Sequence, residues 1–122
     1  MSDGRVVLTT LGHLEKAEQL ARALVERRLA ACVNIVGPIR SIYRWQGAIE
    51  DQQEYLLIIK TTSERAADLD CAFAELHPYD LPEHVELSIE GGSAAYLEWF
   101  SAQVSAEKQS RPDRWGMASN CQ

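Results

Sequence analysis

The order in which hydrophobic residues change their spacing is the feature that most constrains how this chain folds. Short apolar and β-branched runs, which favour strands, lie at 6–10, 31–45, 55–59 and 85–89. Apolar residues at the three- and four-residue spacing of an amphipathic helix lie at 13–29, 61–76 and 93–104. This order predicts an α+β fold: a ferredoxin-like βαββαβ antiparallel sheet with an added C-terminal helix.

The second predicted strand is long and bent. Gly37-Pro38 interrupts its run at 31–45, and a proline inside a strand marks an edge position or a bulge. The strand pairs with the run at 55–59 as an antiparallel hairpin, whose turn lies either at Gln46-Gly47 or at 50–52. The sequence alone leaves both registers open.

Local signals predict where the second helix starts and stops. Thr61 precedes Glu64 by three residues, which matches a capping box. His77 comes directly before Pro78, and a residue in that position disfavours helical dihedrals. The helix should therefore end near Leu76.

Both faces of the predicted sheet are apolar. Val85, Leu87 and Ile89 alternate with polar residues, so we expect these three side chains to form the buried side of their strand. Two helices cover one face of the sheet, and the strand runs are too apolar for the other face to be left in water. Either the third helix covers it or another copy of the chain helps.

Length, charge and motif content limit the class of protein. We expect one domain at 1–104 and a flexible tail at 105–122, where periodicity vanishes. The formal net charge of -6 has the wrong sign for neutralising a phosphate backbone, so no nucleic acid partner is expected. No signal segment and no apolar run of about 20 residues is visible, which predicts a cytoplasmic protein without a membrane partner. The common nucleotide-binding, acyl-transfer and zinc-protease motifs are absent, so nothing in the sequence indicates an enzyme.

The segment at 77–84, HPYDLPEH, concentrates side chains that bind metals or carry protons. A neutral imidazole at His77 or His84 binds borderline metals and titrates near neutrality. The alternatives are a helix C-terminal histidine at 77, favoured by the helix dipole, and a solvated histidine at 84. Asp80 and Glu83 either bind a hard cation or simply keep the loop solvated.

Cys32 and several aromatic side chains are further candidates. Cys32 lies in an apolar strand, where a free cysteine is usually a small buried hydrophobe, but its thiolate would be a soft ligand for copper or zinc. Tyr43 and Trp45 on the hairpin and Trp99 on the last helix either line a small-molecule cleft or form an oligomer interface.

Several motifs together resemble the CutA divalent-cation tolerance family. They are LAACVNI at 29–35, SIYRWQG at 41–47, KT at 60–61, HPY at 77–79 with PE at 82–83, and YLEW at 96–99. They occur in the family's order and span about 6–104, which makes the match more specific than any single motif.

The resemblance implies a homotrimer assembled through sheet edges and the long hairpin. It also implies a link to copper and other divalent cations, with Cys32 and His77 at positions discussed as ligands and Glu83 and His84 as further candidates. Tyr79 and Asp80 would then line an intersubunit cleft. Two residues depart from the family pattern: Asp80 stands in place of a more usual glutamate, and His84 in place of an aliphatic residue.

The predicted function is a trimeric, cytoplasmic, metal-responsive binding protein without an obligatory cofactor. Its predicted partners are other copies of itself and copper or another divalent cation. The sequence names no other protein partner. The alternative is a sensor like the PII signalling proteins, in which a small anionic metabolite occupies the intersubunit cleft and metal is incidental.

Overall fold

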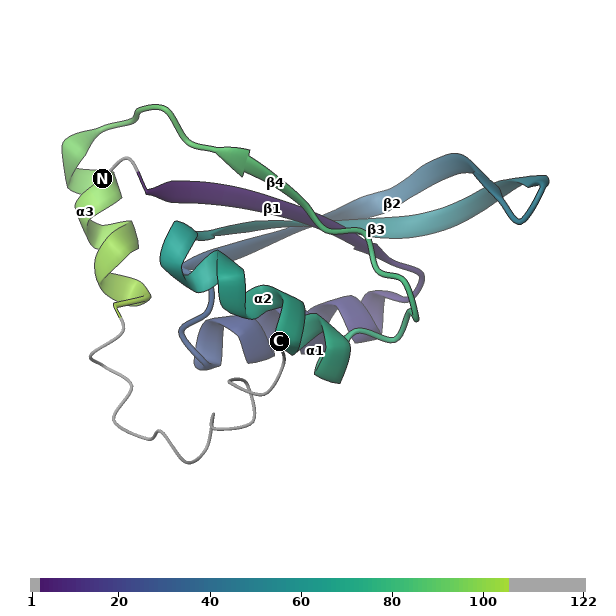
Figure 1. Cartoon of the computed structure of the whole chain (residues 1–122), viewed down its shortest axis with the longest axis horizontal. Helices are drawn as coiled ribbons and strands as arrows, with labels where there is room; N and C mark the ends of the chain where they lie inside the picture. The colour runs from purple at the N-terminus through teal and green to yellow at the C-terminus, as the bar shows by residue number, and fades with distance from the viewer. Residues whose placement is uncertain (1–2, 106–122) are drawn as a thin grey trace.

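Figure 1 shows the computed structural model, which describes residues 3–105; apart from Ser105, the predicted tail lies outside the described residues. The helices and strands follow one another in the predicted order. They are β1 (Gly4–Leu11), α1 (Leu14–Glu26), β2 (Cys32–Trp45), β3 (Ala48–Thr62), α2 (Ser63–Leu76), β4 (Val85–Ser88) and α3 (Ala94–Gln103). The predicted α+β class and ferredoxin-like order are confirmed.

The strands form one antiparallel sheet in the order β2-β3-β1-β4. α1 and α2 pack on the same side of this sheet (Figure 1). Between the helices and the sheet lies the core, in which Val7, Leu57 and Ile59 of the strands and Leu24 and Leu69 of the helices have no exposed surface. We call this side of the sheet the helix face and the opposite side the open face.

The open face carries the alternate residues of the same strands. Their side chains are largely apolar: Val6, Leu8, Val36, Leu56, Ile58, Val85 and Leu87. Val36, Val85 and Leu87 are 41%, 45% and 49% exposed. α3 covers only one end of this face, where a Cβ added at Gly4 would lie 3.4 Å from the Phe100 ring. The third helix of the described chain therefore does not cover the open face alone.

Val85 and Leu87 of β4, predicted to form the buried side of their strand, are 45% and 49% exposed. Val85 pairs with Leu8 and Leu87 with Val6, so both apolar side chains lie on the open face and not in the core. Glu86 lies on the other side of the strand and forms an ion pair with Arg5 at 3.0 Å. A period of two shows which residues share a face, but it does not show which face is buried.

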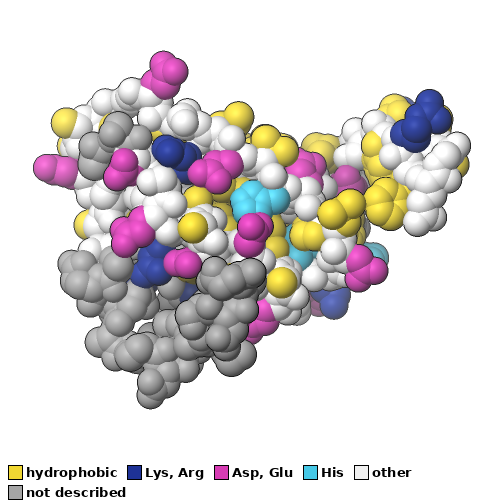
Figure 2. Space-filling view, in the orientation of Figure 1, with side chains coloured by type: hydrophobic (Ala, Val, Ile, Leu, Met, Phe, Trp, Pro, Cys, Tyr) yellow, Lys and Arg dark blue, Asp and Glu magenta, His cyan; other side chains and the backbone are white. Residues whose placement is uncertain are grey.

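β2 and β3 form the long predicted hairpin, and its register shifts between Val36 and Ile39, at Gly37-Pro38. The turn lies at Gln46-Gly47, the first of the two predicted positions. Both turn residues have positive φ, 50° and 85°, as a two-residue type I′ turn requires. The tip of the hairpin projects beyond the rest of the chain and carries hydrophobic side chains (Figures 1 and 2).

α1 is shorter than predicted because the chain turns sharply at its C-terminus. The helix ends at Glu26, and Arg28 adopts φ 59°. The backbone N–H of Leu29 donates to the Leu24 carbonyl, while that of Arg28 donates to the Val25 carbonyl. This is the hydrogen-bond pattern of a Schellman motif, which ends the helix before Leu29.

The N-cap of α2 is one residue later than predicted. The Thr62 hydroxyl accepts a hydrogen bond from the Arg65 backbone N–H, so Thr62 caps the helix. Thr61 is fully buried and its hydroxyl instead donates to the Leu29 carbonyl at 2.7 Å. The C-terminal limit at Leu76 agrees with the prediction.

Candidate functional site

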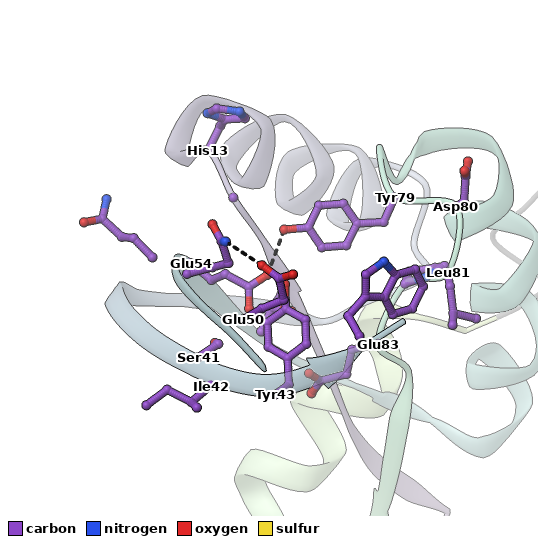
Figure 3. A pocket seen from close by; sticks show the side chains of 16 residues that line it. His13, Ser41, Ile42, Tyr43, Glu50, Glu54, Tyr79, Asp80, Leu81 and Glu83 are labelled. Atoms are coloured by element: carbon purple, nitrogen blue, oxygen red, sulfur yellow. Dashed lines mark hydrogen bonds between the residues drawn. The ribbon is translucent and has the colours of Figure 1, made fainter. Parts of the chain in front are cut away.

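A groove of about 1120 Å³ opens where the β2–β3 hairpin faces the loop that follows α2 (Figure 3). Aromatic rings line it: Tyr43 and Trp45 from the hairpin and Tyr79 from the loop. Its lining also contains four carboxylates, Glu50, Glu54, Asp80 and Glu83, and no lysine or arginine among the described residues. The groove is therefore acidic and partly aromatic.

Glu54 is the most buried of these carboxylates, with only 6% of its surface exposed. The Tyr79 hydroxyl donates a hydrogen bond to Glu54 Oε2 at 2.7 Å (Figure 3). Burial and then this bond to a carboxylate raise the pKa of Tyr79, so its hydroxyl stays protonated and remains a donor. A Cβ added at Gly12 would lie 3.3 Å from that hydroxyl oxygen, so the glycine leaves room for Tyr79.

Glu83 is close enough to Glu54 for the two carboxylates to repel each other. Partial burial raises the pKa of the Glu83 carboxyl, and the negative charge of Glu54 raises it further. Within residues 3–105, neither carboxylate forms an ion pair with a basic side chain. Two neighbouring carboxylates without a counter-ion favour a cation or a proton between them.

His77 positions the loop through both of its ring nitrogens. The side chain is buried on the helix face, where Nε2 lies 3.0 Å from the Thr9 hydroxyl oxygen. Nδ1 accepts a hydrogen bond from the Tyr79 backbone N–H at 3.2 Å. Burial lowers the pKa of His77, outweighing the Thr10 carbonyl and the Glu54 charge, which act in the opposite direction. A metal ion would have to displace one of these two partners before it could bind the ring.

His84 lies against α2 and does not line the groove. Its Nδ1 is 2.8 Å from Asp70 Oδ1, and its ring contacts Phe73 edge-on with ring centroids 5.3 Å apart. The Phe73 ring also contacts His77, at 5.5 Å. Both histidine rings therefore contact the same phenylalanine.

Cys32 lies on the open face, away from the histidines. It pairs with Lys60, while Thr9, the partner of His77, pairs with Leu57 on the helix face. The thiol is free and half-buried, and its Sγ lies 3.8 Å from Asn34 Oδ1. Among the described residues, no three His, Cys, Asp or Glu side chains lie close enough to hold one metal ion.

The predicted cleft residues divide between two places. Tyr43, Trp45, Tyr79 and Asp80 line the groove, as does Glu83 from the predicted metal set. Trp99 lies on α3 beside Tyr96, with ring centroids 5.5 Å apart, and is not part of the groove.

Sequence reasoning missed Glu54, the carboxylate at the centre of the groove. Its signal was available, because a glutamate directly precedes the apolar run at 55–59. Glu50, considered only as part of a possible turn at 50–52, also lines the groove. Glu50 and Glu54 reach the groove because of the register between β2 and β3, and the sequence alone left that register open.

The fold and groove define the class of protein as a ferredoxin-like α+β domain with an elongated hairpin and a candidate cation-binding groove. No helix among the described residues is long and apolar enough to cross a membrane. The family description "CutA1 divalent ion tolerance protein" matches residues 5–103. A Thermus thermophilus protein named "Divalent-cation tolerance protein CutA" is 51% identical over 95 residues, which cover 78% of this chain and 92% of that protein. The chain belongs to the CutA divalent-cation tolerance family, as its motifs predicted.

Solved structures of relatives share this fold. The divalent cation tolerance protein of Thermus thermophilus superposes with a TM-score of 0.81 at 47% identity, covering 84% of this chain and 99% of that one. CutA from Synechococcus elongatus, complexed with a Bis-Tris molecule, gives a TM-score of 0.78 at 42% identity, covering 84% and 95%. Some relatives are longer: the chloroplastic CutA of Arabidopsis thaliana is 45% identical over 95 residues, which cover 78% of this chain but 52% of that protein.

Proposed function

We propose that this family member acts as a cytoplasmic homotrimer that binds divalent cations, copper among them, and that it is a binding protein and not an enzyme. The observation that supports cation binding is the acidic groove, in which Glu54 and Glu83 form no ion pair with a basic side chain among the described residues. A divalent cation would supply the positive charge that the described residues around them lack.

The proposal of a trimer is supported by the exposed apolar residues of the open face and of the hairpin. Val36, Val85 and Leu87 leave a large fraction of their surface in water, next to the half-buried Leu8 and Ile58. A contiguous apolar patch of this kind marks a surface that another molecule covers. Tyr43 and Trp45, 41% and 46% exposed on the projecting hairpin, are residue types that protein interfaces favour.

Of the four predicted metal ligands, only Glu83 lines the groove. Carboxylate oxygens accept many divalent cations, whereas selection of copper needs an imidazole or a thiolate as well. Cys32 pairs with Lys60, about 20 Å along β3 from Glu54, so its thiol would reach the groove only from another copy. His77 would contribute only after releasing Thr9 or Tyr79.

Calorimetric titration of the purified protein with Cu(II), Zn(II) and Mg(II) tests the cation proposal. We expect Cu(II) and Zn(II) to bind more tightly at pH 7.5 than at pH 5.5, because the ligands must lose protons, and Mg(II) to bind far more weakly. Glu83→Gln should weaken binding roughly tenfold, about 1.4 kcal/mol. Glu98→Gln, which changes an exposed carboxylate on α3, serves as the matched control. Equal affinities for the two variants would contradict the proposal.

A second function, a small-molecule sensor, is favoured by one comparison. The Synechococcus relative was solved with Bis-Tris, an amine that carries several hydroxyl groups. An acidic groove with aromatic walls suits such a ligand better than the anionic metabolite expected from sequence, because a carboxylate lining repels an anion. Titrations with Bis-Tris and with ATP, each in metal-free buffer, separate the two ligand classes. Binding of ATP alone would favour the anionic metabolite.

A further inference from the structure

The alternate residues of β3 form a stripe whose charge changes sign along the open face. Glu54, Leu56, Ile58 and Lys60 point to the same side of the strand, since successive side chains alternate. The acidic groove lies at one end of this stripe, two apolar residues follow, and a lysine lies at the other end. Six residues of strand separate the two charged side chains by about 20 Å.

Neither end of the stripe forms an ion pair with another described side chain of the same copy, although Glu54 accepts a hydrogen bond from the Tyr79 hydroxyl. Lys60 is half-buried between Cys32 and Val6, and it forms no ion pair with another described side chain. Glu54 is 6% exposed, and its neighbour Glu83 already has a raised pKa. Charges withdrawn from water are normally paired, because an isolated buried charge is costly.

A single copy cannot join these charges, because a lysine side chain is far shorter than the roughly 20 Å between them. Two copies can, if the basic end of one stripe meets the acidic end of another. In a cyclic trimer every contact is of this head-to-tail kind, so each copy donates one lysine and receives one. The apolar residues in the middle of the stripe would be covered by the same contact.

We propose that Lys60 of one copy lies in the acidic groove of the next copy, where its ammonium group is the counter-ion of Glu54 and Glu83. The inference rests on the trimer proposed above. It makes the groove a composite site, in which a residue from a second copy neutralises the buried Glu54 and the exposed Glu83 beside it. A divalent cation that enters the groove then competes with this ammonium group for Glu83.

Charge reversal tests the contact in the full-length protein. Lys60→Glu should weaken self-association roughly tenfold or more, measured by sedimentation over a dilution series in low-salt urea, an uncharged denaturant that does not screen the ion pair. Lys60→Arg keeps the charge and is the matched control, with association expected to stay within about twofold. The double variant Lys60→Glu with Glu83→Lys should recover most of the loss. Circular dichroism of each variant shows whether the subunit itself remains folded.

Zero-length cross-linking of the unmodified protein gives a second measurement. A carbodiimide joins amines to carboxylates that touch, so we expect peptides linking Lys60 to Glu54 or Glu83 only in species larger than one chain, and none in Lys60→Arg. A trimer with neither cross-link nor charge-reversal rescue would overturn the inference and leave the trimer standing. A monomeric wild-type protein would overturn both.

Discussion

Cys32 and His77 lie on opposite faces of one sheet. Cys32 pairs with Lys60 on the open face, whereas His77 contacts Thr9 on the helix face. Bonds from a metal ion to sulfur or imidazole nitrogen are only about 2.0–2.3 Å long, so one ion cannot reach both side chains across a sheet. A copper site that uses both residues would have to combine two copies of the chain.

The buried state of His77 predicts how stability depends on pH. Burial lowers the pKa of His77 in the folded chain below its ordinary value of about 6.5, so the unfolded chain takes up a proton first. The contribution of His77 is therefore complete above about pH 6.5 and is lost as pH falls through the lower folded pKa. Urea unfolding at pH 7.5, 6.5 and 5.5, at one protein concentration, should show this loss.

His77→Gln provides the control for that measurement, because it cannot titrate. The free energy of unfolding of this variant should fall less between pH 7.5 and 5.5 than that of the wild type. Glu83 has a raised pKa and acts with the opposite sign at lower pH, but it is present in both proteins and cancels in the comparison. Parallel pH profiles would show that His77 is not held neutral by the fold.

Tyr79→Phe should destabilise the loop after α2, which lines one side of the groove. The substitution removes the 2.7 Å hydrogen bond to Glu54 and leaves a buried carboxylate without its donor. We expect the free energy of unfolding to fall by roughly 1–3 kcal/mol. Tyr43→Phe, in an exposed side chain of the same groove, should change it by less than about 0.5 kcal/mol. Equal effects of the two substitutions in urea unfolding would contradict this role for Tyr79.

Substitutions at Thr61 and Thr62 distinguish the observed cap from the predicted one. Thr61→Val keeps the side-chain volume but leaves the Leu29 carbonyl without its buried donor, at a cost of about 1–3 kcal/mol. Thr62→Ala removes the N-cap of α2 and should cost about 1 kcal/mol. Thr62→Ser keeps the cap and should recover most of that loss. If Thr62→Ala and Thr62→Ser unfold at the same urea concentration, Thr62 does not cap the helix.

The sequence predicted the order of the elements because periodicity depends on local spacing. It also placed Tyr43, Trp45, Tyr79, Asp80 and Glu83 among the candidate residues, and all five line the groove. The two-residue turn at Gln46-Gly47, whose positive φ angles select one of the two registers, fixes where Tyr43 and Trp45 lie opposite β3. The three loop residues join them only through tertiary packing.

Longer-range relations could not be predicted in the same way. The alternation in β4 leaves open which face meets the helices, and Val85 and Leu87, predicted to be buried, lie exposed on the open face. Glu54 and Tyr79 are 25 residues apart in sequence, and their hydrogen bond exists only because the loop after α2 passes the end of β1. Contacts of this kind depend on tertiary packing and leave no local pattern.

The most direct test of the proposed function is the mass of the full-length protein in solution. Sedimentation equilibrium at micromolar concentration should give a single species of three times the 13.7 kDa chain mass, because three copies would cover the apolar residues of the open face. A species of one chain mass would contradict the trimer, and with it the composite groove in which Lys60 of one copy meets Glu54 of the next.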